Sequence, residues 1–258
     1  MTGISKIIAP KEVDEICEIH GTKKVRLYGY TICTKCEQEK IELEKRTLVA
    51  NFTEKNIRGA LRCMSLVNDQ RSYNNRFDNF EALASTKEAL IKKQARLIAG
   101  EYLKYPDKQF NTVLFGEPGA GKTHLAMSMV QAVNSNFKPP KKCLFVDIGT
   151  LVLKIRNSFK DTTSWWTESN AIRLMTSVNL LVLDDLGSES AMSSGHEATN
   201  FVQEVLFKVT SSQHRIITTT NLDKDGLYST YNSKLVSRLF EKSKGHVINF
   251  AGIKDKRF

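Results

Sequence analysis

Residues 116–123 have the sequence Gly-Glu-Pro-Gly-Ala-Gly-Lys-Thr, which matches the P-loop of nucleotide-binding proteins. The apolar run Thr112–Phe115 precedes this stretch, and a helical pattern begins near Lys122. Glycines between a strand and a helix let backbone N–H groups turn inward around phosphates, and the helix N-terminus adds partial positive charge. The alternative is a chance glycine-rich turn, which this strand–loop–helix context disfavours. The backbone of residues 119–124 is therefore expected to surround the phosphates of a nucleotide.

Two side chains of the loop carry the expected chemistry. Lys122 is placed to reach the β- and γ-phosphates of ATP, and the hydroxyl of Thr123 is placed to bind Mg²⁺. We therefore expect ATP and Mg²⁺ as ligands. The residues expected to bind the nucleotide are Gly116, Glu117, Pro118, Gly119, Ala120, Gly121, Lys122, Thr123 and His124.

A second motif supports the first. The apolar run Leu180–Leu183 ends in Asp184 and Asp185, as in a Walker B strand. We expect Asp184 to hold Mg²⁺ through water, and Asp185 to orient or deprotonate the attacking water. The alternative is that two acids simply close the strand as a turn. Asn221 follows another strand and is expected to hold the attacking water near the γ-phosphate.

The pattern of apolar runs predicts the fold. Ser85 and Glu88 have the spacing of a capping box, which predicts a helix from there to about Leu103. Continuous apolar strands that alternate with helices indicate a parallel sheet covered on both faces. The class is therefore α/β with a five-stranded parallel sheet. The expected strands are 113–115, 143–146, 180–183, 216–220 and 247–250.

Composition limits the class of protein further. The chain has 258 residues, 41% hydrophobic and 26% charged, as in ordinary soluble globular proteins. It has no apolar run near the roughly 20 residues of a membrane helix, and its start lacks the apolar core of a signal peptide. We therefore expect a cytoplasmic protein without a membrane partner. The net charge of +10 weakly favours contact with nucleic acid or an acidic protein face.

Four residues near the N-terminus predict a structural zinc site. Cys17 and His20 form one pair with two residues between them, and Cys33 and Cys36 form another. Two such pairs can close a tetrahedron around Zn²⁺, with a hairpin expected at residues 23–30 between them. The alternative is unrelated cysteines and a histidine. The chain has five cysteines, and an odd number in a cytosolic protein argues against a disulfide framework.

The same patterns suggest a division of the chain. We expect a zinc-binding domain at residues 1–48, a helical and polar linker at 49–75, and an ATPase domain at 76–258. A run of alternating Glu and Lys at 37–46, typical of an exposed helix, leads into the linker, which ends in a polar stretch.

Several motifs in order carry a family resemblance. They are Arg-Phe-Asp-Asn-Phe at 76–80, the extended P-loop at 115–126, the Walker B strand with its two acids, Thr-Thr-Thr-Asn at 218–221, and Leu-Val-Ser-Arg-Leu at 235–239. Together they resemble AAA+ ATPases of the bacterial and phage DnaC/DnaI helicase-loader group, which is related to the IstB type. The resemblance covers about residues 76–258.

The resemblance implies further roles. Asn221 matches the sensor-1 position, and Arg238 matches the arginine that reaches the ATP of a neighbouring subunit; the alternative for Arg238 is an ordinary surface arginine. Arg257 lies where the family often has a C-terminal arginine. Arg156, Phe159 and Lys160 lie in the region that resembles a single-strand-binding insert, although an amphipathic helix with a basic outer face would share this pattern.

The resemblance implies an ATP-dependent loader that binds a hexameric replicative helicase and single-stranded DNA, self-assembles through its AAA+ domain, and hydrolyses ATP slowly. The zinc domain would grip the helicase. One alternative is an IstB-type transposition ATPase, which binds duplex DNA and a transposase. Another is a zinc-bearing adaptor in which ATP is a switch and is barely hydrolysed. The sequence leaves the identity of the helicase, the subunit number, a chromosomal or phage origin, and the roles of Arg257, Trp165 and Trp166 open.

Overall fold

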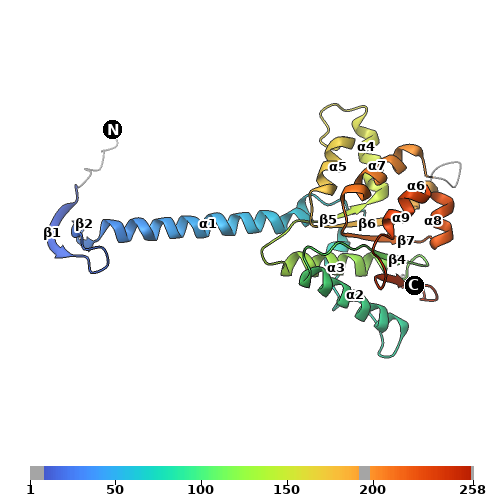
Figure 1. Ribbon diagram of the computed structural model, residues 1–258, viewed down its shortest axis with the longest axis horizontal. Coiled ribbons are helices and arrows are strands. Elements are labelled where there is room, and N and C mark those ends of the chain that lie inside the picture. Colours follow the sequence, from blue (N-terminus) through green and yellow to red (C-terminus); the bar gives the residue numbers. More distant parts are fainter. Residues whose placement is uncertain (1–8, 192–197, 257–258) are drawn as a thin grey trace. The chain divides into compact units, whose positions relative to one another are not determined.

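The computed structural model describes residues 9–191 and 198–256. The chain divides into two compact units, Met1–Asn56 and Ile57–Phe258, and each is described by itself (Figure 1). Helix α1, Thr34–Cys63, begins in the first unit and ends in the second. The domain limits expected from the sequence, at 48/49 and 75/76, remain a prediction.

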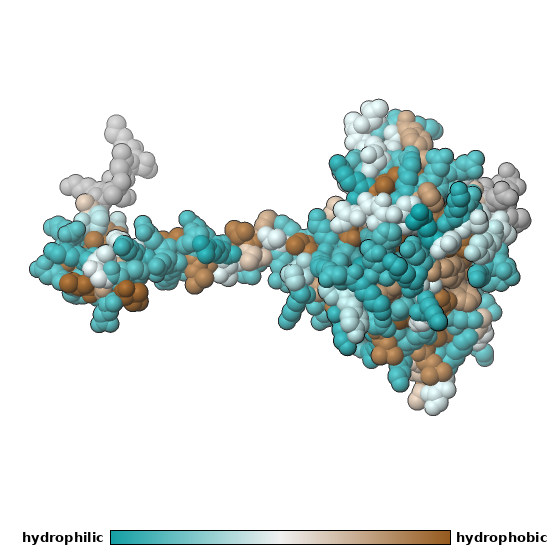
Figure 2. Space-filling view, viewed as in Figure 1, coloured by the Kyte–Doolittle hydropathy of each residue, from teal (hydrophilic) through white to brown (hydrophobic). Residues whose placement is uncertain are grey.

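The first unit begins with a small antiparallel sheet in the order β1-β2-β3. Its strands are β1 (Lys11–Ile16), β2 (Lys23–Leu27) and β3 (Tyr30–Ile32). Tyr28 and Gly29 join β2 to β3 with φ values of 48° and 85°, and such positive values match the twist of a two-residue hairpin. The hairpin expected at residues 23–30 is therefore confirmed. Helix α1 then leaves the sheet, with exposed apolar side chains scattered among charged ones (Figure 2).

The second unit contains a five-stranded parallel sheet in the order β5-β6-β7-β4-β8. This confirms the α/β class and all five expected strands. The strands are β4 (Thr112–Phe115), β5 (Cys143–Asp147), β6 (Leu180–Leu186), β7 (Ile216–Thr220) and β8 (Val247–Asn249). The helices of this unit after α1 are η1 (Gln70–Asn74), α2 (Lys87–Lys104), α3 (Lys122–Asn136), α4 (Ile148–Ser158), α5 (Glu168–Thr176), α6 (Ser188–Ala191), α7 (Asn200–Ser212), α8 (Lys224–Thr230) and α9 (Ser233–Leu239).

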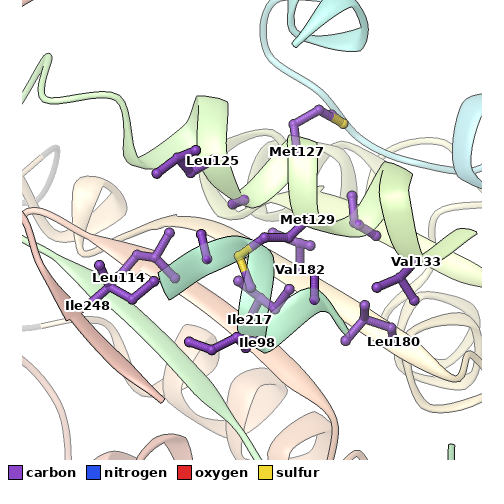
Figure 3. Packing of buried hydrophobic residues seen from close by; sticks show 14 of the residues in the cluster. Ile98, Leu114, Leu125, Met127, Met129, Val133, Leu180, Val182, Ile217 and Ile248 are labelled. Atoms are coloured by element: carbon purple, nitrogen blue, oxygen red, sulfur yellow. The ribbon is translucent and has the colours of Figure 1, made fainter. Parts of the chain in front are cut away.

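Helices cover the sheet on both faces. Alternate residues of a strand point to opposite faces, so Leu180 and Val182 of β6 enter one core while Leu181 and Leu183 enter the other. Helices α2 and α3 cover the first face, where side chains of α3 lie directly over those of the strands (Figure 3). Helices α4, α5, α7 and α9 cover the second face. Because both faces are buried, the strands are mostly apolar before their carboxyl ends, although β7 ends in three threonines.

A short segment after α1 extends the edge of this sheet. Leu66 forms a parallel bridge with Val146. Its N–H donates to the carbonyl oxygen of Phe145 at 2.9 Å, and its own carbonyl accepts from the N–H of Asp147 at 2.8 Å. From the sequence, this segment was expected to belong to the linker. In the structure, Leu66 is buried in a core of the ATPase unit.

One local prediction was wrong by a residue. The N-cap of α2 is Thr86, whose hydroxyl accepts from the N–H of Ala89, and Ser85 does not cap the helix. Ser85 instead adopts a positive φ of 65° just before the cap. No helix in the described part of the chain has the length and apolar character needed to cross a membrane.

Candidate functional site

The phosphate-binding loop connects β4 to α3, as the sequence predicts. Gly121 has a φ of +93° and caps the helix. A Cβ atom on this glycine would lie 2.7 Å from the ring of Phe80, so a larger residue would clash as well as strain the backbone. The Nζ atom of Lys122 lies 2.7 Å from the carbonyl oxygens of both Gly116 and Glu117. The ammonium group is thus held over the loop, where phosphates would bind.

His124 has a different environment from the rest of the loop. Its Nε2 lies 3.0 Å from the carbonyl oxygen of Arg76 and 3.0 Å from Oδ1 of Asn79. Its ring meets Phe80 edge-on at 5.2 Å. His124 therefore ties the 76–80 segment to α3, and its assignment as a nucleotide contact remains a prediction.

The Walker B acids lie near the carboxyl end of β6. The hydroxyl of Thr123 donates to Oδ1 of Asp184 at 3.1 Å, and the hydroxyl of Thr219 donates to the same oxygen at 2.6 Å. The amide of Asn221 donates to Oδ1 of Asp185 at 3.1 Å. The structure thus brings together Thr123, Asp184, Asp185 and Asn221, which were expected from separate motifs.

The two carboxylates have different surroundings. Asp184 is only 5% exposed, whereas Asp185 is half-buried. Burial raises the pKa of Asp184 to about 7, although hydrogen bonds from Thr219 and Thr123 oppose the shift. A buried carboxylate next to a threonine hydroxyl is an oxygen donor set that suits Mg²⁺, because a divalent cation would stabilise its charged form. Asp184 and Thr123 therefore fit the magnesium role expected of them.

These groups line a cavity of about 380 Å³. Eight of its lining residues were expected from the sequence, namely Pro118, Gly119, Gly121, Lys122, Thr123, Asp184, Asp185 and Asn221. Six others were missed, namely Val67, Asn68, Asp69, Ser72, Asp147 and Thr219. Asp147 could have been found, since it ends β5 as Asp184 nears the end of β6. Residues 67–72 have no sequence pattern that points to the cavity, because they reach it through the pairing of Leu66 with β5.

This arrangement can perform phosphoryl transfer to water. Backbone N–H groups and Lys122 would bind phosphate oxygens, which stabilises the negative charge of the transferring group. Asp185, with the amide of Asn221 on its carboxylate, can accept a hydrogen bond from the attacking water and orient it. Magnesium, when bound beside Thr123 and Asp184, would supply positive charge to the β- and γ-oxygens.

The fold and the site define a P-loop ATPase of the AAA+ type. A family model described as IstB-like ATP binding protein matches residues 54–238, and the chain belongs to this family. The comparison with curated protein sequences finds no significant match.

Solved structures share the fold. A structure described as the DnaC helicase loader is 20% identical with a TM-score of 0.51, and the match covers 72% of this chain and 100% of that one. A DnaI structure is 19% identical with a TM-score of 0.53, covering 72% of this chain and 95% of that one. AMPPCP-bound DnaA from Aquifex aeolicus is 18% identical with a TM-score of 0.51 and covers 70% of this chain. The chain spans about half of that DnaA, since 50% of it is covered.

The other predicted residues lie outside this cavity. Arg238 does not line it; the guanidinium of Arg238 lies over the ring of Phe207, 5.2 Å from its centroid. Arg156 lines an adjoining cavity of about 520 Å³ that shares Asn68, Asp147 and Asp185 with the nucleotide cavity.

Two further DNA candidates follow α4. Phe159 is 65% exposed but contacts Phe201 edge-on at 5.7 Å, and Lys160 is exposed. Trp166 packs against the second core, whereas Trp165 is 44% exposed. Arg257 lies outside the described residues.

The four predicted zinc ligands form a cluster in the first unit. Their ligand atoms all lie within 4.8 Å of one another. Nδ1 of His20 is 3.7 Å from the sulfur of Cys17, 3.7 Å from that of Cys33 and 3.3 Å from that of Cys36. The sulfurs of Cys17 and Cys36 are 3.6 Å apart. A tetrahedral zinc with ordinary bond lengths places two sulfurs about 3.8 Å apart and sulfur and nitrogen about 3.6 Å apart, so the four residues fit the metal.

Two further observations support a structural metal here. Among described residues 9–56, only Cys17 and Cys33 are buried, so this unit has almost no apolar core. Nε2 of His20 lies 3.0 Å from Oε1 of Glu39, an outer partner that orients the ring with Nδ1 toward the sulfurs. A metal would replace the missing core as the source of stability.

Two substitutions test the nucleotide site. Lys122→Ala removes the charge that faces the phosphates and should weaken ATP binding and reduce kcat by roughly 10²-fold or more. Asp185→Asn keeps the shape of the side chain and should retain ATP binding but lose turnover. Lys142→Ala, an exposed lysine just before β5, is the control and should match the wild type. Full activity of Lys122→Ala, measured as phosphate release, would contradict the assignment.

Elemental analysis tests the metal site, and one zinc per chain is the expected result. Cys33→Ser should lose the metal and expose residues 9–36 to protease, while the ATPase unit stays folded. Cys63→Ser is the matched control, because Cys63 is exposed and outside the cluster. A metal-free protein in which residues 9–36 resist protease as before would show that the cluster is not a zinc site.

Proposed function

We propose that the chain is an ATP-dependent loader that places a hexameric replicative helicase on single-stranded DNA. The observation that carries the proposal is that one chain has both a P-loop and Walker B site and a separate Cys/His unit. The DnaC and DnaI folds support it, since the match covers all of the chain in the structure described as the DnaC helicase loader. In this proposal residues 1–48 contact the helicase and residues 76–258 form the ATPase domain.

The surface of the first unit is suited to protein contact. Ile16, Ile19, Tyr28 and Tyr30 are each more than 60% exposed around the small sheet. Exposed groups of large apolar side chains often mark a site of protein interaction. We assign the helicase contact to this unit, and self-assembly and DNA binding to the AAA+ domain.

Single-stranded DNA binding is assigned to the end of α4. Arg156 and Lys160 would contact phosphates, and the exposed ring of Phe159 would stack on a base. Arg156 lines a cavity that includes Asp185, so DNA bound there would lie next to the ATPase site. This placement offers a route by which DNA could alter the rate of hydrolysis.

The IstB-like family match keeps one alternative open, namely a transposition ATPase that acts with a transposase on duplex DNA. The Cys/His unit and the paired Asp184 and Asp185 favour the loader. A zinc-bearing adaptor in which ATP is only a switch is the other alternative. Single-turnover hydrolysis, measured with and without single-stranded DNA, separates the adaptor from both ATPases.

A loading assay tests the proposed function. We expect the chain with ATP to raise the amount of the host's hexameric helicase recovered on circular single-stranded DNA, because nucleotide turnover releases the helicase onto the strand. Lys122→Ala should leave recovery at the level seen without the chain. The proposal fails if the chain binds no helicase. Stimulation of a transposase on duplex DNA would instead support the IstB-type alternative.

The role of Arg238 can be tested by mixing two inactive variants. If Arg238 acts on a neighbour's ATP, Arg238→Ala should bind ATP normally yet hydrolyse it about 10³-fold more slowly. Asp185→Asn has an inactive site but still offers Arg238 to a neighbour. Mixed assemblies of the two should recover part of the activity, because one interface then pairs an intact site with an intact arginine.

The mixing experiment requires conditions in which subunits assemble, with helicase or single-stranded DNA present. Arg238 lines a surface hollow of about 500 Å³ with Phe207 and Glu241, where a neighbouring subunit has room to approach. Mixed assemblies that form and stay inactive would show that Arg238 acts within its own chain or is structural.

A further inference from the structure

We infer that Thr219 is a positioning residue for ATP hydrolysis, which holds the carboxylate of Asp184 and the backbone of Asp185 through a single hydroxyl group. Thr219 lies on β7, next to β6, and is only 1% exposed. No motif in the sequence singles it out from Thr218 and Thr220 beside it. The inference concerns ATP hydrolysis itself and does not depend on the proposed loader function.

The hydroxyl of Thr219 makes two different hydrogen bonds. It donates to Oδ1 of Asp184 at 2.6 Å and accepts from the backbone N–H of Asp185 at 2.9 Å. A hydroxyl has one proton to donate and lone pairs to accept with, so one group can serve both acids. The first bond orients a carboxylate, and the second fixes the backbone that carries the other carboxylate.

The strand pairing shows why the second bond is needed. Leu183 pairs with Thr218 and Leu186 pairs with Thr220, so Asp184 and Asp185 together oppose the single residue Thr219. This is a β-bulge, in which an extra residue on one strand loses its regular partner. Asp185 adopts a φ of +57° in the bulge, and a non-glycine residue rarely holds this conformation without support. The Thr219 hydroxyl takes the N–H group that the bulge leaves unpaired.

The first bond acts on the magnesium side of the site. Thr123 and Thr219 both donate to Oδ1 of Asp184. Because the hydroxyl of Thr123 donates its hydrogen bond to the carboxylate, the lone pairs of the hydroxyl oxygen remain free to bind a metal ion. Thr219 holds the carboxylate in the rotamer that keeps this arrangement. Thr219 therefore links the orientation of Asp184, which is expected to hold Mg²⁺, to that of Asp185, which is expected to orient the attacking water.

The neighbouring threonine offers a matched control. Among the described residues, Oγ1 of Thr218 has no hydrogen-bond partner, although Thr218 is also 1% exposed and lies on the same strand. Thr218→Val and Thr219→Val make the same chemical change at equally buried positions. Only the second removes hydrogen bonds to the acids. Exchanging an unpaired buried hydroxyl for a methyl group has no hydrogen bond to lose.

The experiment compares four variants of the full chain. Thr219→Val should reduce kcat, or raise the Mg²⁺ concentration for half-maximal hydrolysis, by roughly 10–100-fold, as loss of an outer partner of a metal ligand does. Thr219→Ser keeps the hydroxyl and should restore most of the activity. Thr218→Val should match the wild type. ATP affinity measured in EDTA should be the same in all variants, because the P-loop binds the phosphates. Thermal unfolding reports whether each variant is folded.

Thr219→Cys is the fourth variant and covers the case in which Thr219→Val does not fold. Its thiol fits the space but hydrogen-bonds weakly, so its activity should fall well below that of Thr219→Ser. The inference is overturned if Thr219→Val or Thr219→Cys hydrolyses ATP at the wild-type rate with unchanged Mg²⁺ dependence. It is also overturned if Thr218→Val loses as much activity as Thr219→Val, since the loss would then reflect general damage to β7.

Discussion

Burial of the parallel sheet on both faces is the constraint on which the rest of the structure depends. The apolar side chains of β4, β6 and β7 enter one of two apolar cores, so polar groups reach a ligand at or near the carboxyl ends of the strands. All five strands are parallel, and their carboxyl ends therefore share one edge. The P-loop, Asp147, the Walker B acids and Asn221 all lie at that edge. The polar residues of the site lie at this edge because apolar cores cover both faces of the rest of the sheet.

The bulge in β6 turns this edge into a site with two distinct acids. In a regular strand, Asp184 and Asp185 would point to opposite faces of the sheet. The extra residue and the positive φ of Asp185 re-aim the pair, so that one acid is buried beside Thr123 and the other reaches Asn221. Burial raises the pKa of Asp184, whereas Asp185 stays half-buried at the water side. Adjacent residues of one type can therefore take separate roles.

The first unit depends on a different source of stability. Its three short strands leave most side chains exposed, and the two buried residues among the described residues 9–56 are cysteines of the Cys/His cluster. A unit this small cannot offset the loss of chain entropy by apolar burial alone. If the cluster binds zinc, the metal supplies that stability and leaves the apolar surface of the unit free for a partner.

The sequence by itself was sufficient for the class of fold, the five strands, the P-loop and the two acids. Each is a local pattern: an apolar run of a given length, or a fixed spacing of glycine, lysine and threonine. The spacing of the cysteines and His20 was likewise enough to predict the cluster that the structure shows. The cap of α2 was placed one residue early, because Ser85 and Thr86 are both good caps and only backbone geometry decides between them.

Only the tertiary structure decided which distant residues meet at the site. The bridge of Leu66 to β5 brings residues 67–72 to the nucleotide cavity. The register of β6 on β7 selects Thr219, and not Thr218 or Thr220, as the partner of the two acids. Strand order and register arise from packing between segments far apart in the chain, and three consecutive threonines are identical as local sequence. Their separate roles exist only once β6 and β7 are paired.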